Sequence, residues 1–127
     1  QVAVLHSGLS SGERYDQWRR IIAGEVCVAI GARSAIFAPL DQPGLIIVDE
    51  EHDSSYKQET GFRYNARDLA VVRARQQNCV ALLGSATPSV QSYHNVESGR
   101  FKLVRLNQRV ADQPLPAIQV VDLSRVL

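Results

Sequence analysis

Three carboxylates and one imidazole come directly after an apolar run of the chain: Asp49, Glu50, Glu51 and His52 follow Leu45–Val48. Four consecutive apolar residues, three of them β-branched, predict a strand that is buried on both faces. Clustered carboxylates repel one another, so the cluster calls for a counter-charge. Ligands of an open α/β sheet gather outside the carboxyl ends of its strands. The pattern therefore predicts a Mg²⁺-nucleotide site at this strand end.

Asp49 and Glu50 have different expected roles. A Mg²⁺ ion held among nucleotide phosphates takes one or two protein carboxylates, and Asp49 is the first residue off the strand. Hydrolysis of the terminal phosphoryl group also needs a group that orients the attacking water, and Glu50 is the candidate. The alternative is a plain solvated strand end, which explains a lone acidic pair more easily than it explains the whole string.

A second apolar run, Val80–Leu83, ends in small and hydroxyl residues, among them Ser85 and Thr87. Their hydroxyls are expected to hydrogen-bond the carboxylates or His52 on a neighbouring strand. Thr87 has an alternative role as the N-cap of a helix that begins near Pro88, and the two roles are compatible.

Between these strand ends, aromatic rings alternate with cations. The rings that offer stacking faces are Tyr56, Phe62 and Tyr64, and the cations that suit phosphates are Lys57, Arg63 and Arg67. Stacking of a base on an aromatic ring contributes about 1–3 kcal/mol and works with any sequence. We expect a mobile loop that orders on single-stranded DNA; the alternative is that the aromatics cover an edge of the core.

Arg33 and Ser34 follow Gly31 at the end of another expected strand and open a short helix. Backbone N–H groups there, with the guanidinium of Arg33 and the hydroxyl of Ser34, would form an anion site for a DNA phosphate. A purely structural turn is the alternative.

Apolar runs and helix caps predict the elements that position these residues. Strands are expected at residues 2–5, 26–30, 45–48, 80–83 and 101–106. Helices are expected from the capping box of Ser10 and Glu13 to Ile22, from Asn65 with Leu69 and Val72 inward, and from Pro88 to Gly99. Strands that alternate with helices indicate an α/β fold with a mostly parallel sheet flanked by helices.

The composition narrows the class of protein. The chain has 127 residues, 45% of them hydrophobic, and a net charge of +1, so any nucleic-acid surface must be local. No run of apolar residues reaches the length of a membrane span, and no signal peptide opens the given sequence. Cys27 and Cys79 lie in separate apolar runs and are expected to be buried free thiols. Because the chain begins inside a strand at Gln1, we expect it to be a piece of a longer protein.

The order of the motifs resembles a known class of motor proteins. The D-E-E-H string at 49–52, followed by S-A-T at 85–87, resembles motifs II and III of superfamily 2 helicases. The longer strings at 49–58, 63–70 and 84–89, with those at 5–10 and 31–39, resemble the primosomal replication-restart helicases of bacteria. This resemblance covers nearly the whole chain.

The resemblance implies a RecA-like, P-loop NTPase type of fold. It implies that residues 1–106 form the later part of the first motor lobe and that residues 107–127 connect toward the second. It assigns Asp49 to Mg²⁺ and Glu50 to hydrolysis. It implies that His52 links the ATP site to the DNA-facing motifs and that Ser85 and Thr87 couple hydrolysis to strand separation. By the same resemblance, the segment from Tyr56 to Asp68 would match the aromatic-rich, DNA-coupling loop that restart helicases share in type with RecQ-like helicases.

The resemblance also implies the parent's activity and partners. The parent would be an ATP-dependent 3′→5′ DNA helicase that restarts stalled forks by primosome assembly. It would act on single-stranded and forked DNA, together with primosome and single-strand-binding proteins, in the cytoplasm and at the nucleoid. The parent would use ATP and Mg²⁺ at the site after residues 45–48, and it would bind zinc outside this segment. No membrane partner is expected.

One motif of a motor is missing from these residues: the sequence contains no G-x-x-x-x-G-K-[ST] phosphate loop. The resemblance places that loop before Gln1, so the chain alone is expected to be inactive. Two alternatives stay open, namely a lobe of another superfamily 2 ATPase such as a RecQ-like translocase, and a non-enzymatic α/β binding module.

Overall fold

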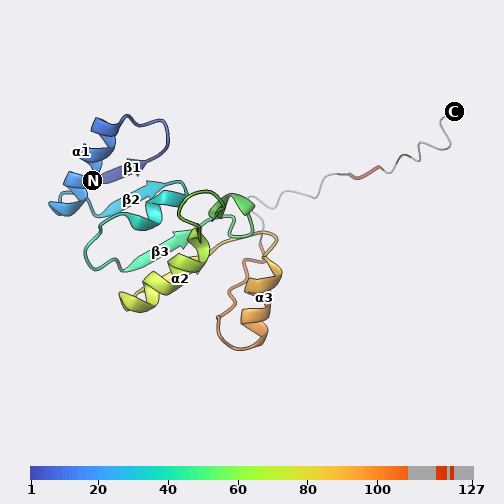
Figure 1. Cartoon of the computed structure of the whole chain (residues 1–127). Helices are drawn as coiled ribbons and strands as arrows, with labels where there is room; N and C mark the ends of the chain where they lie inside the picture. Colours follow the sequence, from blue (N-terminus) through green and yellow to red (C-terminus); the bar gives the residue numbers. More distant parts are fainter. Residues whose placement is uncertain (109–116, 120, 122–127) are drawn as a thin grey trace.

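The computed structural model describes residues 1–108, 117–119 and 121. Strands and helices alternate along them (Figure 1). The elements are β1 (Val2–Leu5), α1 (Ser11–Ile22), β2 (Val28–Gly31), the 3₁₀ helix η1 (Arg33–Phe37), β3 (Leu45–Val48), the 3₁₀ helix η2 (Ser54–Tyr56), β4 (Lys57–Gln58), β5 (Tyr64–Asn65), α2 (Ala66–Gln76), β6 (Val80–Leu83) and α3 (Val90–Glu97).

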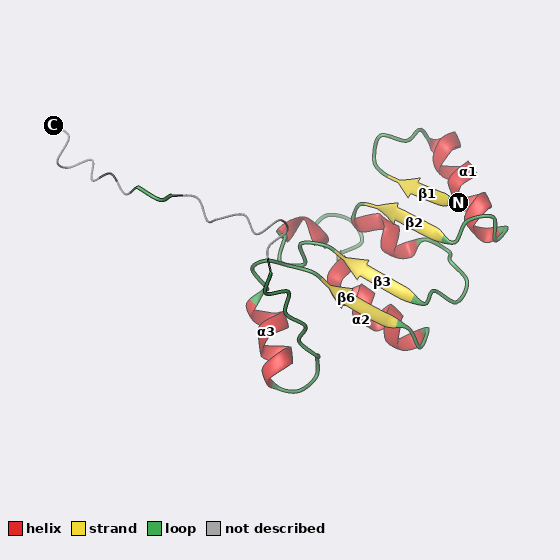
Figure 2. Ribbon diagram, turned by 180° about the vertical axis from the view of Figure 1, so that it is seen from behind, coloured by secondary structure: helices red, strands yellow, loops and turns green. Residues whose placement is uncertain are grey.

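Four of the strands run parallel and lie side by side in the order β1, β2, β3 and β6 (Figure 2). β1 pairs with β2, with Val2 opposite Val28, and β3 pairs with β6, with Val48 opposite Leu83. The remaining two strands, β4 and β5, form a short antiparallel pair. The predicted α/β fold with a mostly parallel sheet is therefore confirmed in this coarse form.

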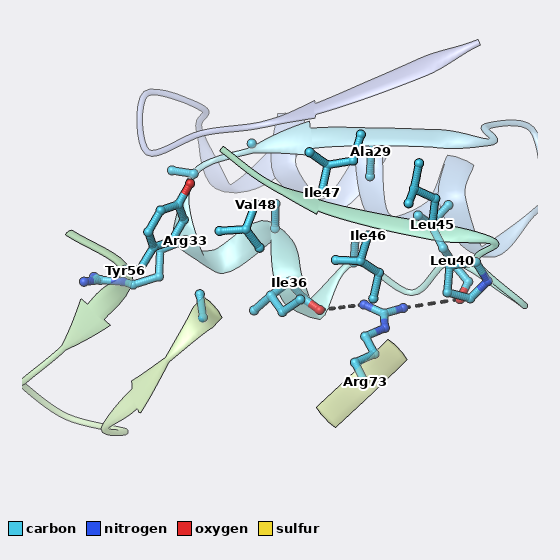
Figure 3. Close-up of a pocket in the computed structure, with 16 residues that line it drawn as sticks. Ala29, Arg33, Ile36, Leu40, Leu45, Ile46, Ile47, Val48, Tyr56 and Arg73 are labelled. Carbon is cyan, nitrogen blue, oxygen red and sulfur yellow. Dashed lines mark hydrogen bonds between the residues drawn. The ribbon is translucent and has the colours of Figure 1, made fainter. Parts of the chain in front are cut away.

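A pocket of about 150 Å³ lies at the junction between the β1–β2 pair and the β3–β6 pair, where η1 follows β2. Figure 3 shows Arg73 of α2 below this pocket. Its guanidinium donates to the carbonyl of Ile36 at 2.5 Å and to that of Leu40 at 3.4 Å. Arg73 thus ties α2 to the segment that joins the two strand pairs.

Helices cover one face of the sheet. α1 and η1 pack on β1 and β2 around the buried residues Ala3, Leu5, Ile21, Val26 and Ala38. α2 packs on β3 and β6 through a face of small residues, Ala66, Ala70 and Ala74, which are nearly inaccessible to solvent. Val72, which was expected to point inward, is half exposed, because the close approach of α2 to the sheet uses the alanine face instead.

The other face of the sheet is apolar and open among the described residues. It consists of the alternate positions of the four parallel strands, each at least 44% exposed: Val2, Val4, Val28, Ile30, Leu45, Ile47, Val80 and Leu82. The expectation that residues 45–48 are buried on both faces is thus wrong for this chain, since Leu45 and Ile47 face outward. Parallel sheets are normally covered on both faces, so this apolar sheet face is unusual.

Three expected elements need correction. Residues 101–106 do not form a strand: the N–H of Phe101 donates to the carbonyl of Asn95 at the end of α3, and no strand of the described chain lies beside 102–106 to form a ladder. The second strand begins at Val28 rather than 26. The last helix is capped by Ser89, not Thr87, and therefore starts after Pro88.

Two further expectations concern the cysteines and the connector at the C-terminal end. Cys27 is exposed and Cys79 is half-buried, so the prediction of buried thiols is wrong, although both are free. Of the expected connector at 107–127, residues 109–116, 120 and 122–127 lie outside the described residues. No described helix has the length and apolarity needed to cross a membrane.

Candidate functional site

A tight turn follows β3 and carries the acidic string. The N–H of Gly84 donates to the carbonyl of Val48 at 2.8 Å, and the N–H of Glu51 donates to the carbonyl of Gly84 at 3.0 Å. These two bonds fasten the turn to the end of β6. Within the turn, Glu50 has a φ of +47°, a left-handed conformation that is uncommon for a residue with a side chain. Such conformations concentrate at functional sites, where the surroundings hold them in place.

The carboxylate of Asp49 is exposed at the end of β3, next to Gly84. Its Oδ1 accepts a hydrogen bond from the N–H of Glu50 at 3.0 Å, which orients the side chain. Among the described residues, no group of three or more His, Cys, Asp or Glu side chains could hold a metal ion by itself. One exposed, oriented carboxylate suits a Mg²⁺ ion whose other ligands are phosphate oxygens and water.

His52 lies between the two strand ends. Its Nδ1 atom is 2.7 Å from Oγ of Ser85 and 3.4 Å from a carboxylate oxygen of Glu50. Ser85 Oγ also accepts from the N–H of Thr87 at 3.0 Å. The structure therefore brings Ser85 to His52, one of the two arrangements expected from the sequence, and β6 lies beside β3 as expected. Thr87 joins this group through its backbone N–H, and its role remains a prediction.

The third carboxylate, Glu51, was not singled out from the sequence, and it is the most buried residue of the turn at 3% exposure. It accepts hydrogen bonds from Ser89, Ser92 and Arg67. Burial alone would raise the pKa of Glu51, but the hydrogen bonds outweigh burial and hold its pKa below the ordinary value. The spacing of Ser89 and Ser92, three residues apart at the start of a helix, was the only sequence signal for this site.

The aromatic-rich segment is a folded hairpin, which we call the aromatic hairpin (residues 54–65; η2, β4 and β5). Lys57 pairs with Asn65 and Gln58 with Tyr64. The sequence predicted a mobile loop that orders on single-stranded DNA; the structure shows short regular elements in this segment, and ordering on DNA stays a prediction. Its first turn reaches the acidic site, because the hydroxyl of Tyr56 donates to the backbone carbonyl of Asp49 at 2.6 Å.

Arg33 holds the aromatic hairpin from the side of η1. Its guanidinium donates to the carbonyls of Ser55 at 3.1 Å and Lys57 at 2.9 Å, and it lies 5.9 Å from the ring centre of Tyr64. These contacts directly support the alternative that the turn with Arg33 has a structural role. Ser34 is exposed beside it, and contacts of Arg33 and Ser34 with a DNA phosphate remain predictions.

The aromatics of the hairpin differ in exposure. Tyr64 is half-buried and packs edge-on against Phe37, with ring centres 5.0 Å apart, whereas Phe62 is 73% exposed. Tyr64 therefore packs on another aromatic ring, that of Phe37, which is itself 43% exposed, while Phe62 keeps a free face. The rings of Phe62 and Tyr64 lie 5.9 Å apart.

The three expected cations of this region lie in different surroundings. Arg63 is exposed, and Lys57 is exposed and paired with Glu59 at 2.8 Å. This pair raises the pKa of Lys57 and lowers that of Glu59, mainly through its hydrogen bond. Lys57, Arg63 and Tyr64 line an open hollow of about 640 Å³. The side chain of Arg67 is only 11% exposed and is paired with Glu51, so a contact of Arg67 with DNA requires that pair to open.

The chain is similar over nearly its whole length to several bacterial proteins that share one name. It is 50% identical over 127 residues to the replication restart protein PriA of Bacillus subtilis, 50% over 125 residues to that of Treponema pallidum, and 50% over 132 residues to that of Synechocystis. These matches cover 98–100% of this chain and 16–19% of the relatives, so the chain spans less than a fifth of their length. No family model matches the chain. The resemblance seen in its motifs is thereby confirmed: along its whole length, the chain is similar to one segment of the replication restart protein PriA.

Proposed function

We propose that this chain is the part of an ATP-dependent DNA helicase that hydrolyses ATP at the end of β3 and couples hydrolysis to DNA through the aromatic hairpin. One observation carries the proposal. The exposed acidic turn of Asp49 and Glu50 meets His52 and Ser85 at the ends of two paired parallel strands, and Tyr56 of the hairpin is hydrogen-bonded to that same turn. Ligands of α/β sheets bind at this end of the strands.

Each residue of the turn then has a role. Asp49 would hold Mg²⁺, which when bound with ATP neutralises charge on the phosphates. Glu50 would accept a hydrogen bond from the attacking water and so orient it. The Nδ1 atom of His52 lies 3.4 Å from the Glu50 carboxylate and 2.7 Å from the Ser85 hydroxyl. His52 would therefore connect the water-orienting carboxylate with the end of β6. Thr87 would take part through the turn after β6.

The aromatic hairpin would contact single-stranded DNA with its exposed groups. Phe62 offers a free ring for base stacking, and Arg63 and Lys57, which line one hollow, offer cations for phosphates. Tyr64, Arg33 and Ser34 would shape and support this surface, because Tyr64 and Arg33 hold the hairpin in place. Tyr56 would pass a movement of the hairpin to the turn that carries Asp49.

The remaining proposals concern the whole protein. Residues 1–106 would form the later part of the first RecA-like lobe, and residues 107–127 would lead toward a second lobe. The parent would unwind forked DNA in the 3′→5′ direction in the bacterial cytoplasm, at the nucleoid, and would reload the replication machinery with primosome and single-strand-binding proteins. Its zinc would lie outside this segment. The names of the relatives support a part in replication restart.

ATP hydrolysis by the full-length protein tests the proposal, measured with and without single-stranded DNA. The wild type should hydrolyse Mg-ATP faster with DNA, and Asp49→Asn should lose about 100-fold or more of this rate, since the carboxylate that fixes the metal is gone. Asp16→Asn, an exposed position on α1, is the matched control and should keep the rate. A wild type without ATPase activity would favour a binding module, and a fully active Asp49→Asn variant would remove the assignment of the metal ligand.

A further inference from the structure

Both oxygens of the buried Glu51 carboxylate are fully engaged. Oε1 accepts from the N–H of Ser89 at 2.6 Å. Oε2 accepts from the hydroxyls of Ser89 at 3.0 Å and Ser92 at 2.8 Å, and from the guanidinium of Arg67 at 3.3 Å. The backbone N–H of Glu51 is also fixed, on the carbonyl of Gly84. Main chain and side chain of this residue are therefore held at once.

Glu51 directly follows the strained residue of the turn. Glu50, with its φ of +47°, is the proposed water-orienting residue, and its carboxylate is exposed. A left-handed conformation of a residue with a side chain persists only where its neighbours fix it. On one side the Glu50 N–H is bonded to the side chain of Asp49, and on the other side Glu51 is anchored. The anchoring of Glu51 thus holds the backbone from which the Glu50 carboxylate extends.

Arg67 connects this anchor to the aromatic hairpin. It is the second residue of α2, two positions after the end of β5. Its guanidinium also donates to Ser89 at 3.1 Å, to Gln91 at 2.6 Å and to Asp68 at 2.9 Å, so its direction is fixed. Breaking one side of a buried ion pair leaves an uncompensated charge, which makes the pair hard to separate. A displacement at the end of the hairpin is therefore passed to Glu51.

We infer that Glu51 is a positioning residue of the ATPase site: it fixes the carboxylate of Glu50 and, through Arg67, ties that carboxylate to the aromatic hairpin and to the start of α3. Glu51 does not itself face the site, because its side chain is turned inward against Ser89 and Ser92. The inference rests on the proposed function of Glu50, and it adds a second connection to the hairpin beside the bond from Tyr56 to Asp49.

A double-mutant cycle in the full-length protein tests the inference. The variants are Glu51→Gln, Arg67→Gln and the double variant. The controls are Arg75→Gln, exposed on α2 like Arg67, and Glu97→Gln, exposed on α3, whose start Glu51 contacts. The measurements are kcat and KM for ATP, with and without single-stranded DNA, and the melting temperature. Glu51→Gln should lower kcat about tenfold to 100-fold with KM within about twofold, because a misplaced catalytic group mainly affects the transition state. The double variant should be no worse than Glu51→Gln, since residues that act through one another are not additive.

Arg67→Lys is a second, milder variant that keeps the charge and loses the fixed guanidinium geometry. It should fold and should lower the stimulation by DNA more than the rate without DNA. Unchanged kcat per folded molecule in Glu51→Gln and in Arg67→Lys would overturn the inference, even with a lowered melting temperature, because Glu51 would then be structural only. Additive losses in the cycle would also contradict it. These outcomes leave the wild-type ATPase intact, whereas a wild type without hydrolysis would remove the proposed function and this inference together.

Discussion

The hydroxyl of Tyr56 donates a hydrogen bond to the backbone carbonyl of Asp49 across 2.6 Å. Burial, together with the nearby charges of Asp49, Asp53 and Glu50, raises the pKa of this phenol above its ordinary value, so it stays a donor at neutral pH. The bond joins the first turn of the aromatic hairpin to the residue proposed to hold Mg²⁺. If the hairpin binds DNA as proposed, a shift of the hairpin would therefore reach the proposed nucleotide site directly.

Tyr56→Phe removes this donor and keeps the ring. We expect the stimulation of ATP hydrolysis by single-stranded DNA to fall several-fold, while the rate without DNA stays close to that of the wild type. One hydrogen bond contributes about 1 kcal/mol to stability, so the melting temperature should change little. The measurement is the ATPase rate of the full-length protein over a range of DNA concentrations. Full stimulation in the variant would mean that Tyr56 does not transmit the signal.

Arg63 and Tyr64 are adjacent in sequence but should respond differently to truncation. Arg63 is exposed, so Arg63→Ala should weaken the binding of single-stranded DNA, reduce its salt dependence and leave the melting temperature unchanged. Tyr64 packs on Phe37 and beneath Arg33, so Tyr64→Ala should also lower the melting temperature. Fluorescence anisotropy with labelled DNA at several salt concentrations, alongside thermal melting, separates the two effects. If both variants keep wild-type DNA affinity and stimulation, the aromatic hairpin is purely structural.

Local sequence signals predicted the elements that depend on local physics. The capping box of Ser10 and Glu13 starts α1, where Ser10 and Glu13 satisfy each other's backbone N–H groups. Asn65 caps α2 through a bond to the N–H of Arg67. The runs at 45–48 and 80–83 form the expected strands and lie side by side, which brings Ser85 to His52. Apolar runs and helix caps indicate these helices and strands because each signal lies within a few neighbouring residues.

What the sequence could not predict depends on partners far along the chain. Ser89 rather than Thr87 caps α3 because Ser89 also binds the buried Glu51, which lies 38 residues earlier. Contacts of Arg33 and Arg67 with DNA stay predictions; the sequence did not show that in the folded chain their guanidinium groups hold the hairpin backbone and Glu51. Residues 101–106 have the composition of a strand, yet a strand forms only beside a ladder partner. None of these three outcomes follows from the composition of the segment concerned.

The apolar sheet face should cause the isolated 127-residue chain to self-associate. Parallel sheets are normally covered on both faces, and large exposed apolar patches drive association. We expect the isolated chain to bind a hydrophobic dye and to self-associate, as measured by dye fluorescence and sedimentation. Ile47→Lys should reduce both signals, since Ile47 is 62% exposed on this face. The control is Val90→Lys on α3, where Val90 is 87% exposed. A monomeric chain that binds no dye would contradict this expectation.

The isolated chain should also lack ATPase activity. No G-x-x-x-x-G-K-[ST] loop occurs in these 127 residues, so the β- and γ-phosphates have no cradle of backbone N–H groups and no lysine. A phosphate-release assay with Mg-ATP, with and without single-stranded DNA, checks this. Robust Mg²⁺-dependent hydrolysis by the pure chain would show that it contains a complete site and would overturn its assignment as part of a motor lobe.

Glu50→Gln in the full-length protein tests the central claim, that the turn after β3 hydrolyses ATP, most directly. The measurement is kcat for ATP in the presence of single-stranded DNA, together with the affinity for ATP. Because Glu50 is proposed to act on the attacking water, kcat should fall about 100-fold or more while ATP affinity stays within about threefold. Glu25→Gln, which changes an exposed carboxylate three residues after the end of α1, should keep both values. A Glu50→Gln variant that turns over ATP at the wild-type rate would contradict the account.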